Sequence, residues 1–235
     1  MLRIITDFDG PIMDVSQRYY RVYQYCLETV QAPHQIVQPL SESEFWHCKR
    51  SQVPEREIGH RSGLDVEQAK AFARLRRKTI HTLPYLVYDR PVSSAIAALE
   101  RIQSAQIDLV VMTMRRAQEL EAVLEQHDLS RFFPPDRRYC LSNDYIKQAD
   151  VTDKPLLMQQ ALSELPPAAS TWMIGDTEAD ILAAQQHSLP AIAVLSGIRN
   201  RDRLAMHQPT LILPDLSAAV DLILQRALPT TAVCP

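Results

Sequence analysis

Short apolar runs recur along this chain, and the segments between them carry apolar residues at a helical period. The predicted strands are residues 2–6, 107–113, 138–141, 171–174, 191–195 and 210–213. Several of them are apolar on both faces, which is typical of strands buried in a parallel sheet. The predicted helices that alternate with these strands are residues 92–103, 118–126, 156–164, 179–187 and 217–227. This alternation predicts an α/β fold with a doubly wound, parallel, Rossmann-like sheet.

The connection between the first two predicted strands is far longer than an ordinary crossover. It carries helical patterns at residues 17–30, 42–49, 54–59 and 66–83. Because a crossover needs one helix, we predict an inserted α-helical cap domain at 16–88, with hinges at 12–16 and 88–91. The α/β core domain would then comprise 1–15 and 89–228, and residues 229–235 would form a loose tail.

Composition narrows the class of protein. A hydrophobic content of 46% and a charged content of 23% are those of a soluble globular protein. The net charge of -3 does not suggest nucleic acid as a partner. We find neither a signal peptide nor an apolar stretch of about 18 residues, so no membrane partner is expected. The four cysteines lack CxxC spacing and are expected to be free thiols in a reducing cytoplasm.

Carboxylates gather where two predicted strands end. Asp7 and Asp9 close the first strand in the stretch DFDG, and Asp176 closes the fourth in the stretch GDTEAD, with Asp180 one helical turn later. Taken alone, DFDG could be an Asx turn, and Asp180 could complement a helix dipole. However, the carboxyl ends of parallel strands share one edge of a sheet, so we expect these acids to converge there. Gly10 and Gly175 would support the two turns.

Three further residues, Thr113, Met114 and Lys154, fall near that edge. Thr113 and Met114 close the second predicted strand, although Thr113 could instead cap the following helix. Lys154 precedes Pro155, a residue that suits the first position of a helix. That position would place Lys154 at the positive end of a helix dipole, which is unfavourable unless an anion lies nearby.

A divalent cation would explain the clustered acids, because it offsets the repulsion between them. Hard oxygen ligands favour Mg²⁺, with Asp7, Asp9 and Asp176 as the predicted ligands. Asp180 would act through water or orient Lys154.

Phosphoryl transfer through an aspartyl-phosphate would use all of these groups. Asp7 would attack phosphorus, and Asp9 would protonate the leaving oxygen and later deprotonate the attacking water. The Thr113 hydroxyl and the Met114 amide would hold phosphoryl oxygens, while Lys154 would neutralise charge in the transition state.

These stretches resemble the four motifs of the haloacid dehalogenase-like (HAD) superfamily, in the same order along the chain. DFDG matches the first motif, the run ending in Thr113 the second, Lys154 with Pro155 the third, and GDTEAD the fourth. The insert is similar to the helical cap of the phosphoglycolate phosphatase and β-phosphoglucomutase branch, in which the cap closes over the site. The resemblance implies Mg²⁺-dependent chemistry, and Asp9 argues against a true dehalogenase. Pro11 departs from the usual Thr or Val of the first motif.

The cap is expected to choose the substrate. The cap contains a cluster of basic residues, of which Arg50 is a possible substrate contact; they are Lys49, Arg50, Arg56, His60 and Arg61. The alternative is that this cluster is a solvated surface. In the core, Arg115, just past the second motif, is the other possible substrate contact. We predict a cytoplasmic phosphatase acting on a small phosphorylated metabolite. A phosphomutase on the same scaffold and a non-catalytic HAD-like binding or regulatory protein are the alternatives.

Overall fold

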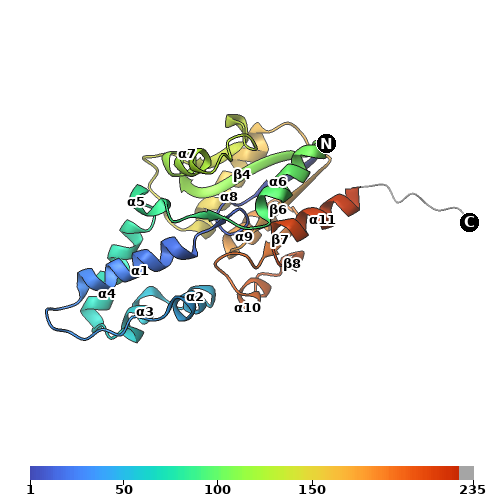
Figure 1. Ribbon diagram of the computed structural model, residues 1–235. Coiled ribbons are helices and arrows are strands. Elements are labelled where there is room, and N and C mark those ends of the chain that lie inside the picture. Colours follow the sequence, from blue (N-terminus) through green and yellow to red (C-terminus); the bar gives the residue numbers. More distant parts are fainter. Residues whose placement is uncertain (228–235) are drawn as a thin grey trace, which may run out of the picture.

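A six-stranded parallel sheet forms the centre of the molecule in the computed structural model, which describes residues 1–227 (Figure 1). Its order is β5-β4-β1-β6-β7-β8. The strands are β1 (Leu2–Thr6), β4 (Asp108–Arg116), β5 (Arg138–Leu141), β6 (Ser170–Gly175), β7 (Ala191–Val194) and β8 (Leu211–Leu213). The predicted doubly wound α/β fold is therefore confirmed, and the first and third predicted strands match β1 and β5 residue for residue. The tail predicted at 229–235 lies outside the described residues.

Helices cover both faces of the sheet because neighbouring residues of each strand point to opposite sides. Ile4 and Val111 pack into one apolar cluster, whereas Ile5 and Val110 pack into the other. The first cluster includes residues of α6 (Ala95–Ser104), α7 (Ala117–Gln126) and α11 (Leu216–Ala227). The second includes residues of α8 (Asp150–Glu164), α9 (Glu178–Gln186) and α10 (Arg201–Ala205). Helix α10 was not predicted from the sequence.

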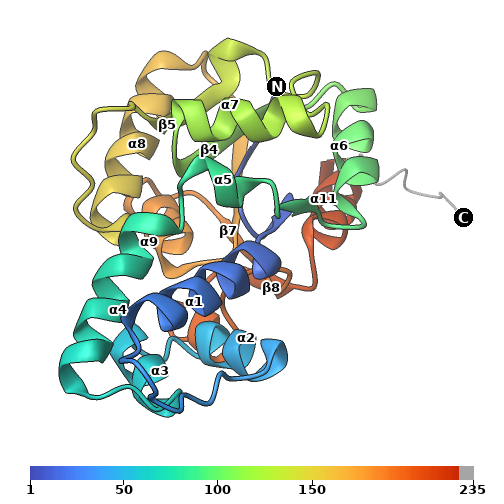
Figure 2. The same cartoon turned by 60° about the vertical axis from the view of Figure 1, so that its left-hand side comes forward.

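Five helices lie within residues 16–86, a segment that we call the helical insert. They are α1 (Ser16–Val30), α2 (Glu42–Arg50), α3 (Glu55–Arg61), α4 (Val66–Thr79) and α5 (Leu83–Leu86). Helices α1 to α4 gather to one side of the sheet (Figure 2). They enclose an apolar cluster of their own, with Tyr23, Phe45 and Phe72 fully buried. The insert thus has a small core separate from the two clusters that flank the sheet.

A short antiparallel ribbon joins the two chain segments that lead into and out of the insert. It pairs β2 (Met13–Asp14) with β3 (Arg90–Pro91), so that Met13 faces Pro91. The Val92 amide also donates to the Ile12 carbonyl at 2.8 Å. Both predicted hinges therefore lie side by side.

Helix α8 begins earlier than the sequence indicated. The prediction that Pro155 opens the helix is wrong, because α8 starts at Asp150 and Pro155 lies inside it. The Ala149 carbonyl accepts hydrogen bonds from the amides of Thr152 and Asp153, at 2.9 and 2.8 Å, and so begins a turn ahead of the proline. Lys154 consequently lies past the first turn, away from the positive end of the helix dipole.

Candidate active site

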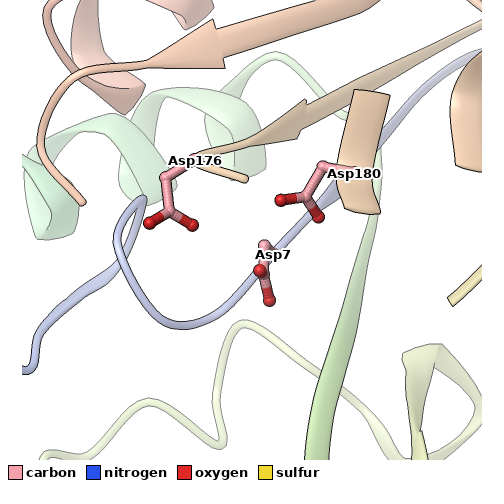
Figure 3. A group of neighbouring side chains, drawn as sticks. All are labelled: Asp7, Asp176 and Asp180. Atoms are coloured by element: carbon pink, nitrogen blue, oxygen red, sulfur yellow. The ribbon is translucent and has the colours of Figure 1, made fainter. Parts of the chain in front are cut away.

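Three carboxylates converge at the carboxyl edge of the central strands. Asp7 follows β1, where its amide donates to the Ile174 carbonyl of β6 at 2.8 Å. Asp176 follows β6, and Asp180 lies in the first turn of α9. One oxygen from each lies within 4.8 Å of the others, and Figure 3 shows the three carboxylates turned toward a common space. All three residues are buried.

Glycines let the backbone approach these carboxylates closely. Gly10 has a φ of +92°, and a Cβ at that residue would collide with the Asp176 carboxylate. A Cβ at Gly197 would meet the same group, and one at Gly175 would meet Asp180. The absence of these side chains leaves room for the Ile198 amide to donate to Asp176 Oδ2 at 2.6 Å.

Lys154 is the cation that faces this cluster. Its Nζ lies 2.7 Å from Asp7 Oδ2 and also pairs with Asp180. The same Asp180 carboxylate accepts from the Thr177 amide at 3.0 Å and from the Thr177 hydroxyl at 2.7 Å, which fixes its position at the start of α9. Burial alone would lower the pKa of Lys154, but Asp180 and Asp7 outweigh it and raise that pKa, so the ammonium keeps its charge. We call Asp7, Lys154, Asp176 and Asp180 the core wall.

The core wall has an excess of negative charge that suits a bound cation. Burial, followed by the neighbouring carboxylates, raises the pKa of Asp7 well above its ordinary value despite Lys154. Burial and Asp180 raise the pKa of Asp176 to about 7. Clustered carboxylate oxygens are the ligands of hard divalent cations, and such a cation would relieve the repulsion that these shifts express. The donor set therefore fits a divalent cation.

The Asp9 carboxylate is not a member of that cluster. Its Oδ2 accepts from Arg18 Nη2 of α1 at 2.8 Å, and its Oδ1 accepts from Arg115 Nε of β4 at 2.8 Å. Burial would raise its pKa, but Arg115 and Arg18 outweigh burial and hold the pKa of Asp9 well below its usual range. Asp9 still faces the same pocket as Asp7.

A pocket of about 230 Å³ brings most of the predicted residues together. Thr113 and Met114 line it, and the Arg115 amide donates to Thr113 Oγ1 at 3.3 Å. Its other predicted lining residues are Asp7, Asp9, Arg115, Lys154 and Asp176. The ends of β1, β4 and β6 and the N-terminal half of α8 thus meet around one small space.

The helical insert supplies the opposite side of this pocket. Lys49 pairs with Glu55, and Arg76 Nη1 lies 2.7 Å from the same Glu55 oxygen. Both cations lie over the Tyr19 ring, at 5.7 and 4.8 Å from its centroid. Arg76 is 6% exposed, and its Nε and Nη2 have no hydrogen-bond partner among the described residues. We call Tyr19, Lys49, Glu55 and Arg76 the insert wall.

Arg50 lies elsewhere. Its guanidinium donates to the carbonyls of Leu195 and Arg199, at 2.9 and 3.3 Å, and it does not line the pocket. The adjoining Gln52 donates to Glu178 at 2.7 Å. Residues 50–52 therefore join the insert to the turn that carries Asp176. The rest of the predicted basic cluster disperses: Arg56 and His60 are exposed, and Arg61 pairs with Glu57 on the surface.

Four residues near the site had no role in the sequence analysis. Arg76 lies in the basic run RLRRK, where spacing does not single out one arginine. Arg18 of the helical insert contacts Asp9, and Asp89, the residue before β3, contacts Arg115. His81 also lines the pocket, and burial followed by Arg18 lowers its pKa well below the ordinary value. Of these four residues, only Asp89 could have been singled out from the sequence, because it falls within the predicted hinge 88–91.

Comparisons with known proteins bear on the family. A family model described as "HAD-hyrolase-like" matches residues 153–219, a range that contains Lys154 and the GDTEAD turn. The chain is 28% identical to a phosphoglycolate phosphatase of Synechococcus elongatus over 237 residues, covering 96% of this chain and 100% of that protein.

Solved structures agree on the fold. A haloacid dehalogenase-like family hydrolase from Streptococcus pneumoniae matches with a TM-score of 0.67 at 19% identity, over 94% of this chain and 97% of that one. A hydrolase from Pseudomonas syringae matches with a TM-score of 0.61 at 15% identity, over 97% and 100%. Together with the sequence matches, these likenesses confirm the resemblance to the HAD superfamily that the motifs indicated. Over residues 1–227, each helix is too short or too polar to span a membrane.

Proposed function

We propose that this protein is a Mg²⁺-dependent phosphatase that hydrolyses a small phosphomonoester through an aspartyl-phosphate on Asp7. The observation that supports this proposal most directly is the core wall, in which buried Asp7 faces a pocket beside Lys154, Asp176 and Asp180. The name of the Synechococcus relative, a phosphoglycolate phosphatase, supports a phosphomonoester substrate. The helical insert would act as the cap, since its residues line the pocket opposite the core wall.

Asp7 acts as the nucleophile in this proposal. A bound Mg²⁺, held by Asp7 and Asp176, would neutralise carboxylate charge and screen the nucleophile from the anionic substrate. Lys154, 2.7 Å from Asp7 Oδ2, also holds the nucleophile in place. The Thr113 hydroxyl and the Met114 amide would bind phosphoryl oxygens, because both residues line the pocket at the end of β4.

Asp9 acts as the proton carrier. It would protonate the leaving oxygen in the first half of the reaction and accept a proton from the attacking water in the second. In the present arrangement two arginines favour its carboxylate form. An anionic substrate beside Arg115 would share that guanidinium and raise the proton affinity of Asp9. Substrate binding would therefore favour the protonated Asp9 that the first half of the reaction requires.

The insert wall would bind a second anionic group of the substrate. Lys49 and Arg76 carry two positive charges against the single carboxylate of Glu55, and Arg76 has N–H groups without partners in the described structure. Arginine and lysine in such a position suit a carboxylate or a phosphate. A pocket of about 230 Å³ restricts the substrate to a small molecule. Phosphoglycolate, after which the relative is named, has such a second anionic group.

A phosphomutase is the second candidate. The same two cations of the insert wall could hold the second phosphate of a sugar bisphosphate while it reorients. Hexose 1-phosphate isomerisation without net release of phosphate would favour the mutase, whereas free phosphate as the product would favour the phosphatase.

The test is a phosphatase screen with about a hundred phosphorylated metabolites, run with Mg²⁺ and after EDTA treatment. We expect phosphate release from small esters that have a second anionic group, and a loss of about 100-fold or more when the metal is removed. Mg²⁺ should also raise the melting temperature of the wild-type protein but not of an Asp176→Asn variant. Phosphate release that is unaffected by EDTA, or none from any ester, would contradict the proposal.

A further inference from the structure

A buried square of alternating charges surrounds the carboxylate of Asp9. Arg18 bridges Asp9 Oδ2 at 2.8 Å and Asp89 Oδ1 at 3.1 Å. Arg115 bridges the other oxygens of the same two acids, with its Nη2 at 2.6 Å from Asp9 Oδ1. Arg18 and Asp89 are fully buried, and Arg115 is 1% exposed. Each cation therefore touches both anions, and the four charges sum to zero.

The four residues come from both sides of the hinge. Asp9 and Arg115 belong to the core, at the ends of β1 and β4. Arg18 lies in the first turn of α1, and Asp89 immediately precedes β3. The β2–β3 ribbon holds these two segments together. The square thus connects Asp9 directly to the two segments about which the insert would move.

Arg18 depends on both acids. The first turn of α1 has no acidic residue, so the arginine lies at the positive end of the helix dipole without a local counter-charge. Fully buried, it would be very unfavourable without Asp9 and Asp89. A buried ion cluster of this kind gains little stability over apolar packing, so stability alone does not account for its geometry. What the geometry does achieve is to fix both oxygens of Asp9.

We propose that Asp89 and Arg18 are positioning residues that aim Asp9 at the leaving-group oxygen, an inference that rests on the proposed phosphatase function. Asp89 accepts a hydrogen bond from Arg115 Nη2 and lies 3.1 Å from Arg18 Nε, a charge contact without hydrogen-bond geometry, and so limits how far the two arginines draw Asp9 away from the pocket. Arg18 Nη1 and Arg115 Nη1 have no hydrogen-bond partner within the described part of the chain. Without Asp89, both guanidiniums would turn further N–H groups toward Asp9 and withdraw it from the substrate.

The dependence on the leaving group tests this role. A p-nitrophenyl leaving group departs without a proton, whereas an alkyl alkoxide requires one from Asp9. For Asp89→Asn we expect kcat/KM, which covers the steps up to leaving-group departure, to fall about 10- to 100-fold on the best alkyl phosphate of the screen. On p-nitrophenyl phosphate it should change less than about threefold.

Two further variants keep the test decisive. Arg18→Gln combined with Asp89→Asn restores charge balance around Asp9 and Arg115, so we expect it to fold and to recover part of the activity on the alkyl phosphate. Asp108→Asn is the matched control, because Asp108 also bridges two arginines, Arg3 and Arg137, at 2.7 Å each, and its side chain is 7% exposed. It lies at the opposite end of β4, and it should affect both substrates equally if at all.

The outcomes separate the two ideas. A wild-type protein that hydrolyses neither ester would overturn the proposed function and this inference together. A wild-type protein that hydrolyses both, with Asp89→Asn slowing them by the same factor, would overturn the inference and leave the phosphatase proposal intact. A selective loss on the alkyl ester, partly recovered in the double variant, would establish Asp89 and Arg18 as positioning residues.

Discussion

Two lysines face the same pocket, Lys154 buried and Lys49 with 11% of its side chain exposed, and their pKa values shift in opposite directions. Lys154 in the core wall contacts Asp7 and Asp180, and these carboxylates raise its pKa in spite of burial. Lys49 in the insert wall contacts one carboxylate, Glu55, which it shares with Arg76. Burial, and then Arg76, lower the pKa of Lys49 to about 8. Burial penalises both ammonium groups, so the number of neighbouring charges decides the sign.

This contrast extends to the two walls. The core wall has three carboxylates against one lysine; Asp7 and Asp176 directly follow strand ends, where the backbone of the sheet determines their position, and Lys154 and Asp180 lie on helices α8 and α9. The insert wall has two cations against one carboxylate, held by contacts between side chains of different helices. A phosphate ester with a second anionic group would span the pocket, its phosphoryl end toward the metal site of the core and its other anion toward the insert. We therefore expect core-wall substitutions to abolish chemistry and insert-wall substitutions to change selectivity.

The largest expected effect comes from Asp7→Asn. Loss of the nucleophile should lower kcat by at least about 1,000-fold on every substrate of the screen. Because the pKa of Asp7 is raised in the folded protein, its ionised form disfavours folding, and the neutral variant should melt at the wild-type temperature or above it without Mg²⁺. Steady-state kinetics and thermal unfolding check both points. Near-normal turnover in this variant would refute the assignment of Asp7 as nucleophile.

Insert-wall variants should show the next largest effect, and only with some substrates. Lys49→Met and Arg76→Met each remove one cation, so we expect KM for a doubly anionic ester to rise about 10- to 100-fold. KM for p-nitrophenyl phosphate should stay within about threefold. Arg74→Met, at an exposed position of the same helix α4, is the control and should change neither value. Equal losses on both esters would mean that the insert wall does not select a second anion.

Two glycines allow the packing of the core wall to be compared with that of the insert. Gly10 and Gly63 both have positive φ, +92° and +90°. A Cβ at Gly10 would collide with the Asp176 carboxylate, whereas at Gly63 the nearest atom would be 3.6 Å away. Gly63→Ala should therefore cost about 1 kcal/mol of backbone strain in the free energy of unfolding. Gly10→Ala should cost more and also weaken Mg²⁺ binding, measured by denaturant unfolding and calorimetric titration; equal costs at both sites would contradict the close packing.

The smallest effect is a pH dependence of substrate affinity. Because the pKa of Lys49 is about 8, its charge is lost as the pH rises above 8, while Lys154 stays protonated. KM for a doubly anionic ester should rise several-fold between pH 7 and pH 9.5, and Lys49→Met should remove this rise. The contribution of Lys49 to the free energy of unfolding changes in the opposite direction. Because the unfolded chain holds this proton up to about pH 10.5 and the folded protein loses it near pH 8, that contribution increases between these two pH values. A flat KM profile in the wild-type protein would contradict the shifted pKa.

The sequence by itself determined the parallel sheet and the core residues at its edge. Apolar runs of strand length reveal β1 and β6, and Asp7 and Asp176 follow them directly, so backbone topology brings both to one edge whatever the side chains do. The preference of proline for the first position of a helix led to a wrong prediction of where α8 begins, since the hydrogen bonds of the Ala149 carbonyl start this helix ahead of Pro155.

Only the tertiary structure decided which charges of the insert face the pocket. Lys49 and Arg76 lie on different helices, and whether a basic side chain points to solvent or to the pocket depends on how those helices pack, which no local pattern encodes. The square of Asp9, Arg18, Asp89 and Arg115 has the same origin. Its members are separated by 9, 26 and 106 positions along the chain, and tertiary packing brings them within hydrogen-bond distance. Long-range ion pairs carry no periodic signature, because their geometry arises from packing rather than from the local backbone.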